Sequence, residues 1–191
     1  MNSNVEKLVR LMIKGAATKA DRAERVALWN SLSPDEQQQT EESRMFVGFV
    51  QATSIVADPF AHINENPPRP DIRTSIDGRD YYFELGEITD EGLAKSISDS
   101  LKTKMVSGRA ISQDEPLENM LKKKCKKTYE TDGAPIDLLL YYWRQGPYEE
   151  SIANYLRTNC RDIEARFRSS QFIRIWIYDW PSGRVLSKIE R

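Results

Sequence analysis

The sequence is poor in the residues that build zinc sites and disulfides. It has one histidine, His62, and two cysteines, Cys125 and Cys160, among its 191 residues. The cysteines lie far apart without metal-ligand spacing, so we expect free, reduced thiols in a cytoplasmic protein. A single histidine excludes a zinc site with several imidazoles and a histidine-rich catalytic centre. The absence of a glycine-rich phosphate loop excludes nucleotide hydrolysis of the P-loop kind.

Charge and hydropathy give no sign of a nucleic-acid or membrane protein over the chain as a whole. The 28 basic and 29 acidic residues leave a net charge of −1, so binding to a polyanion has to come from a local cluster. No apolar run approaches the roughly 18 residues that a membrane span requires. Residues 1–7 lack the basic segment and apolar run of a signal peptide. We therefore expect a soluble, cytoplasmic protein that makes no membrane contact.

Hydrophobic periodicity predicts helices in the first part of the chain and an α/β pattern after it. Apolar residues recur at helical spacing up to residue 56, and Ser33-Pro34-Asp35-Glu36 is a capping box that starts a helix. The prolines of residues 57–70 exclude a central strand there. The other expected elements are a hairpin at 71–87, a helix from Thr89, a lysine-rich helix from Pro116 to about Thr128, a buried strand at 136–143, a helix from Pro147 with an apolar stripe to Phe167, and strands at 172–178 and 185–189.

This order of elements predicts one α/β domain over residues 1–191. A hairpin whose sheet is extended by strands returning through helices makes a mixed central β-sheet flanked by helices. We expect residues 1–56 to form an N-terminal helical segment packed on an α/β core at 57–191. Because that segment carries no chemistry of its own, contact with a protein partner is an alternative role for it.

The hairpin is the most informative part of the sequence. Asp77-Gly78 is a strong signal for a two-residue turn, and the register that follows places Asp71 directly opposite Glu84. Like charges directly opposed across a ladder are destabilising, so two facing carboxylates need a reason. A shared divalent cation is the usual chemical one.

These residues resemble the motif of the PD-(D/E)xK nuclease superfamily, which has the restriction-endonuclease-like αβββαβ core. Pro70-Asp71 and Glu84-Leu85-Gly86 carry the resemblance, and the element order matches from about Glu41 to Tyr178. The resemblance implies a Mg²⁺-dependent endonuclease that cleaves phosphodiester bonds, in DNA more readily than in RNA, with Mn²⁺ as a substitute metal. It implies that Asp71 and Glu84 are both the metal ligands and catalytic residues.

In that superfamily an acid from the preceding helix often joins the two motif acids. The candidates here are Glu41, Glu42 and, in the loop, Glu65. Residue numbers alone do not rank them.

The motif lysine of the superfamily is replaced by Gly86. A glycine cannot position water or stabilise developing charge, so either the site is inactive or another lysine supplies the cation. Helical rotation places Lys124 within the apolar stripe of the lysine-rich helix, where it needs an acidic partner on the sheet. Lys124 is therefore our candidate for the third catalytic residue. In the alternative interpretation its stem packs and its head reaches water.

The remaining lysines of this helix form a local basic cluster. We expect the cluster to contact nucleic acid through its phosphates, with a solvated helix face as the alternative. Its members are Lys122, Lys123, Lys126 and Lys127, joined by Lys102, Lys104 and Arg109.

Three other interpretations stay open at this point. In the first, Asp71 caps a loop and Glu84 pairs with Arg73 or Arg69. In the second, the fold belongs to a catalytically degenerate relative that binds nucleic acid or a protein. The third concerns assembly, because nothing in the sequence decides between a monomer and a homodimer.

Overall fold

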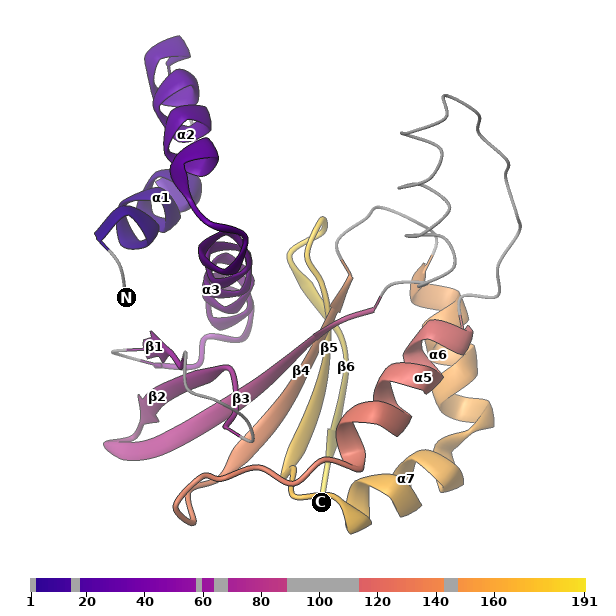
Figure 1. Cartoon of the computed structure of the whole chain (residues 1–191). Coiled ribbons are helices and arrows are strands. Elements are labelled where there is room, and N and C mark those ends of the chain that lie inside the picture. The colour runs from indigo at the N-terminus through magenta and orange to yellow at the C-terminus, as the bar shows by residue number, and fades with distance from the viewer. Residues whose placement is uncertain (1–2, 15–17, 58–59, 64–68, 89–113, 143–147) are drawn as a thin grey trace.

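A mixed β-sheet lies at the centre of the computed structural model, which describes residues 3–14, 18–57, 60–63, 69–88, 114–142 and 148–191 (Figure 1). Within these residues the sheet has six strands that lie side by side in chain order. Neighbours are antiparallel from the first strand to the third, parallel from the third to the fifth, and antiparallel at the last pair. The strands are β1 (Phe60–His62), β2 (Ile72–Ile76), β3 (Arg79–Glu87), β4 (Ile136–Tyr142), β5 (Arg174–Asp179) and β6 (Arg184–Glu190).

Helices cover both faces of the sheet, which confirms the predicted mixed α/β class (Figure 1). Parallel strands need crossover connections, and here helices provide them on the same face of the sheet. α3 packs on the opposite face. The helices are α1 (Ser3–Lys14), α2 (Lys19–Ser31), α3 (Pro34–Thr53), α5 (Asp114–Cys125), α6 (Tyr148–Thr158) and α7 (Cys160–Ser169).

The two-sided cover explains the sequence of β4. All seven of its residues are buried, as expected for a strand inside a parallel sheet. Leu138 and Leu140 pack toward α5, α6 and α7, whereas Leu139 and Tyr141 pack toward α3. The protein therefore has two apolar layers separated by the sheet.

The hairpin has the predicted register. Ile76 pairs with Arg79 and Ile72 pairs with Phe83, and Asp77 and Gly78 both have positive φ, at 52° and 74°. Positive φ at both loop residues matches the right-handed twist of the strands. Asp71 lies immediately before β2, at the next position of this register.

The expected loop over residues 57–70 is wrong at Phe60–His62, which form the edge strand β1. Phe60 pairs with Thr74, and His62 pairs with Ile72. Prolines flank this strand in the sequence, and they are compatible with a short strand at the edge of a sheet.

Two predicted helices have different bounds. The single helix expected after Pro147 is two helices that are separated at Asn159. The backbone of Asn159 is not helical, and its side chain donates to the Tyr155 carbonyl at 3.0 Å. The lysine-rich helix ends at Cys125 in place of about Thr128, and Thr128 is exposed outside the apolar stripe. The helix expected from Thr89 lies outside the described residues.

The N-terminal helices form a smaller apolar cluster beside α3. Val5, Leu8 and Val9 of α1 pack with Leu32, next to Leu28 and Trp29 of α2. The capping box predicted at Ser33 and Glu36 is confirmed at the start of α3. α3 itself packs on the sheet, so it joins the N-terminal segment to the α/β core. None of the described helices is long and apolar enough to cross a membrane.

Candidate functional site

The structure brings Asp71 and Glu84 to the same part of the sheet. The Leu85 N–H on β3 donates to Asp71 Oδ2 at 2.7 Å, and the Asp71 carbonyl accepts from Ile63 N–H at 2.8 Å. Asp71 is therefore hydrogen-bonded to β3 on one side of β2 and to the residue that follows β1 on the other. Glu84 is almost fully buried, with 3% of its surface exposed.

Lys124 of α5 extends from the helix to these acids. Its Nζ donates to Glu84 Oε1 at 2.5 Å and to the Leu85 carbonyl at 2.6 Å, and 12% of its side chain is exposed. The predicted orientation toward acidic strand residues is confirmed, and the alternative with its head in water is wrong. Glu84 pairs with this lysine, whereas Arg73 pairs with Asp80 at 2.6 Å. Arg69 Nη1 lies 3.9 Å from Asp132 Oδ2.

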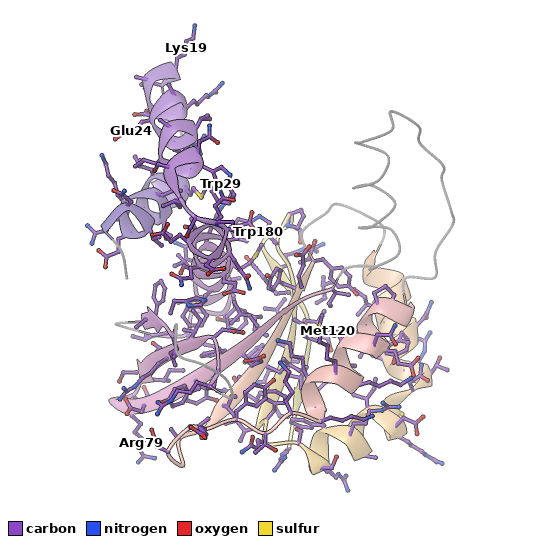
Figure 2. All side chains as sticks on the ribbon, in the orientation of Figure 1. Lys19, Glu24, Trp29, Arg79, Met120 and Trp180 are labelled. Carbon is purple, nitrogen blue, oxygen red and sulfur yellow. The ribbon has the colours of Figure 1, made fainter. Side chains whose placement is uncertain are left out.

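Gly86 explains how α5 comes so close to the strand. A Cβ at this position would lie 2.8 Å from Leu140 Cδ2 and 3.2 Å from Met120 Sδ. Met120 projects from the sheet side of α5 (Figure 2). The space that a motif lysine would need at residue 86 is thus filled by the helix that delivers Lys124. The missing lysine and its replacement are two consequences of one packing arrangement.

Glu42 of α3 is the upstream acid whose charge acts on Asp71. Gln38 Nε2 donates to Glu42 Oε1 at 2.9 Å, and His62 Nε2 of β1 contacts Glu42 Oε2. The pKa of Glu41 is raised mainly by burial and then by the charge of Glu87. Glu41 is therefore close to Glu87. Glu65 lies outside the described residues.

Among the described residues, the charges that act on Asp71 are those of two acids and one lysine. The pKa of Asp71 is raised to about 7, mainly because the carboxyl is buried and then because Glu84 and Glu42 repel its charge. Lys124 and the Leu85 N–H act in the opposite direction. A proton on Asp71, or a bound cation, would relieve this repulsion.

The donor set is suited to a hard cation. No group of three or more His, Cys, Asp or Glu side chains that could hold a metal ion is found among the described residues. Mg²⁺ needs fewer protein ligands, because it retains waters and takes one or two carboxylates together with substrate phosphates. Within the described part of the chain, Asp71 Oδ2 accepts from the Leu85 N–H and Glu84 Oε1 from Lys124, so Asp71 Oδ1 and Glu84 Oε2 are the oxygens that could bind a metal. A pair of carboxylates, completed by waters and substrate oxygens, therefore fits Mg²⁺.

The basic cluster continues from the same helix. Lys123, Lys126 and Lys127 are exposed, and Lys122 forms an i,i+4 ion pair with Glu118. Because α5 ends at Cys125, two of these lysines stand in the turn after the helix. The cluster members Lys102, Lys104 and Arg109 lie outside the described residues.

Two residues that sequence reasoning did not select lie beside the acids. His62 contacts Glu42, and its Nδ1 is buried without a hydrogen-bond partner in the described part of the chain. Tyr129 lies near Glu84. Burial is the largest cause that raises the pKa of the Tyr129 phenol, and the charge of Glu84 is the second. No local pattern could have found either residue, because both contacts join distant segments.

The cysteines add no second site. Both are free, as predicted; Cys125 is buried and Cys160 is exposed. Burial raises the pKa of Cys125 to about 11, which disfavours the thiolate needed for nucleophilic chemistry.

Comparison of the chain with protein-family models, curated proteins and solved structures gave no match. The fold and the side chains of the site therefore carry the functional argument.

The raised pKa of Asp71 predicts a pH-dependent difference in stability. Between its ordinary pKa of 3.8 and about 7, the folded protein keeps a proton that the unfolded chain releases, so stability falls as the pH rises through this interval. Asp71→Asn has no such charge and keeps an acceptor for Leu85 N–H. Its free energy of unfolding relative to wild type should increase from pH 5 to pH 8, by up to about 2.5 kcal/mol.

Urea denaturation in metal-free buffer at the two pH values measures this difference. Asp80→Asn, on the exposed part of the same hairpin, is the matched control and should show no comparable trend. A difference for Asp71→Asn that is equal at both pH values would contradict the prediction.

The packing at Gly86 predicts a destabilising Ala substitution. Gly86→Ala should lower the free energy of unfolding by about 1–3 kcal/mol, because a core position is overpacked. Leu140→Val removes the nearest clashing atom, Leu140 Cδ2. The double variant Gly86→Ala/Leu140→Val should therefore lose less free energy of unfolding than the two single variants lose together. A double-mutant cycle measures the coupling, and additive effects would rule out this contact as the cause.

Proposed function

We propose that this protein is a Mg²⁺-dependent endonuclease of the restriction-endonuclease-like kind that hydrolyses phosphodiester bonds, in DNA more readily than in RNA. The observation that carries the proposal is the meeting of Asp71, Glu84 and Lys124. These residues come from the start of β2, from β3 and from α5. A partly buried carboxylate beside β2, a buried carboxylate on β3 and a lysine at the same point are the parts that the resemblance to the PD-(D/E)xK superfamily calls for.

Asp71 and Glu84 would hold the metal, and Mg²⁺ when bound supplies Lewis-acid polarisation of a phosphoryl oxygen and a lower pKa for water. The chain's own contribution is placement. Lys124 has three N–H donors, and two of them are used by Glu84 and the Leu85 carbonyl. We assign the third to an oxygen of the scissile phosphate, where a positive charge stabilises the charge that develops in the transition state.

The exposed lysines give the substrate its approach. Lys123, Lys126 and Lys127 follow or flank Lys124 on the same segment and are exposed, so they can contact a phosphate backbone close to this segment. Binding through such lysines weakens as salt rises, because bound counterions are released. We therefore assign the local cluster, in a chain with a net charge of −1, to non-specific contact with nucleic acid.

A second function is favoured by the ion pair itself. Lys124 already neutralises Glu84 and occupies the Leu85 carbonyl, as a lysine in a purely structural role would. In that case the protein is a catalytically degenerate relative that binds nucleic acid or a protein without cleaving it. Metal binding separates the two functions.

The metal-binding prediction is a thermal shift. Millimolar Mn²⁺ or Mg²⁺ should raise the melting temperature of the wild type, since a ligand at 100 times its Kd stabilises by about 2.7 kcal/mol. Glu84→Gln should lose the shift and Asp80→Asn should keep it. A wild-type protein that does not respond to either ion would support the non-catalytic function.

The catalytic prediction concerns Lys124. With Mg²⁺, the wild type should nick plasmid and linear DNA and cut RNA of the same sequence more slowly. Lys124→Met should reduce cleavage at least about 100-fold, because transition-state charge loses its partner. Lys126→Met, an exposed neighbour, is the control and should retain most activity at low salt. Circular dichroism checks the fold, and cleavage by Lys124→Met at the wild-type rate would remove Lys124 from the site.

A further inference from the structure

The face of the β2–β3 hairpin that carries the acids also carries an arginine. Ile72 packs in the apolar layer under α3, and side chains alternate along a strand, so Arg73 lies on the opposite face, toward α5. Its register partner agrees with this, because Tyr82 belongs to the apolar layer under α5. The same alternation puts Asp71 and Glu84 on the face of Arg73, two residues further from the turn on β2 and on β3.

Arg73 and Asp71 are spaced along β2 in a way that suits a nucleic-acid strand. Two residues of an antiparallel strand span about 7 Å. This length is comparable to the distance between successive phosphates of an extended nucleic-acid strand. A strand whose scissile phosphate lies at Asp71 therefore has a neighbouring phosphate within reach of Arg73.

The charge of Arg73 stays at the border of the site because Lys124 serves the acid inside it. Asp80 and Glu84 are the two diagonal neighbours of Arg73 on β3, one on each side of Tyr82, and a long side chain reaches either. Glu84 is buried and bound to Lys124, whereas Arg73 is bound to Asp80. Lys124 thus supplies a positive charge within the site, and Arg73 supplies one on the exposed part of the same face.

The ion pair of Arg73 is one that a substrate can replace. Arg73 Nη2 donates to Asp80 Oδ2 at 2.6 Å, and 51% and 56% of the two side chains are exposed. Such an exposed pair contributes little to stability, because both groups are hydrated when they separate. A guanidinium can also form two parallel hydrogen bonds with a phosphate. Exchanging the Asp80 carboxylate for a phosphate therefore costs Arg73 little.

We propose that Arg73 binds the phosphate next to the scissile one, so that the bound nucleic-acid strand follows β2 from Asp71 toward the Asp77-Gly78 turn. This inference rests on the proposed function and names the residue that sets the direction of the substrate across the site. Asp80 holds the guanidinium in the free protein and is released to water when the phosphate binds.

The test compares Arg73→Ala/Asp80→Asn with Asp80→Asn, because neither variant leaves an unpaired carboxylate at residue 80. The probe is a short fluorescent DNA duplex in buffer without divalent ions. At low salt, the loss of Arg73 should raise the Kd about tenfold, as expected for one charged hydrogen-bonded contact. The slope of log Kd against log salt concentration should fall by about 0.9, which corresponds to one phosphate. Arg73→Lys/Asp80→Asn should keep most of the slope, because it keeps the charge.

Arg79→Ala/Asp80→Asn is the matched control, since it removes the same charge from the other face of the same hairpin. Arg79 pairs with Ile76, which packs toward α3, and it lies at the outer end of the hairpin (Figure 2). Its loss should leave the salt slope at the value of Asp80→Asn. The urea midpoints of all these variants should stay close to that of the wild type, because the residues are exposed.

The outcomes separate this inference from the function on which it rests. An unchanged salt slope without Arg73, or an equal loss of slope without Arg79, overturns the role of Arg73. Cleavage of plasmid DNA by the wild type with Mg²⁺ would then still support the nuclease proposal. A wild type that binds no DNA overturns the inference, and one that also fails to cleave DNA with Mg²⁺ rejects the proposed function with it.

Discussion

The site depends on a buried ion pair that joins a helix to a strand. Lys124 and Glu84 have 12% and 4% of their side chains exposed, so removing either partner would leave an uncompensated charge away from water. The pair forms because Gly86 lets α5 approach the sheet, where Met120 and Leu140 fill the space beside it. Packing, charge and the placement of the lysine are therefore a single constraint.

A comparison within the protein distinguishes the candidate site from a structural carboxylate. Asp137 is fully buried, and it accepts hydrogen bonds from the Tyr81 hydroxyl at 2.7 Å, Arg174 Nε at 2.9 Å and Trp176 Nε1 at 2.7 Å. Among the described residues, Asp71 accepts one from Leu85 N–H and faces the charges of two other acids. Among the described residues, Asp137 thus has three side-chain donors and Asp71 has one backbone donor. Carboxyl groups with a strongly raised pKa are enriched at functional sites, although structural ion pairs such as that of Asp137 also shift the pKa.

Local signals were reliable where they constrain geometry directly. The Asp77-Gly78 turn determines a register that brings Asp71 to Glu84, because a two-residue loop leaves no freedom in strand pairing. The rotation of a helix likewise placed Lys124 on the inner face of α5. Failures occurred where tertiary contacts decide, as at the three-residue strand β1 and at the break before α7. A strand of three residues is too short to show an alternating hydrophobic pattern. A side chain that competes for a backbone carbonyl also leaves no hydrophobic pattern in the sequence.

The α/β class, the hairpin register, the acid pair and the side of the helix from which a lysine would come could all be predicted from the amino-acid sequence. These follow from turn chemistry and from the fixed periods of strands and helices. The tertiary structure was needed to show that Gly86 admits α5, that Glu42 contacts His62, and that the charge of Glu42 acts on Asp71. Those contacts join residues far apart in the chain, and their distances depend on how the layers pack.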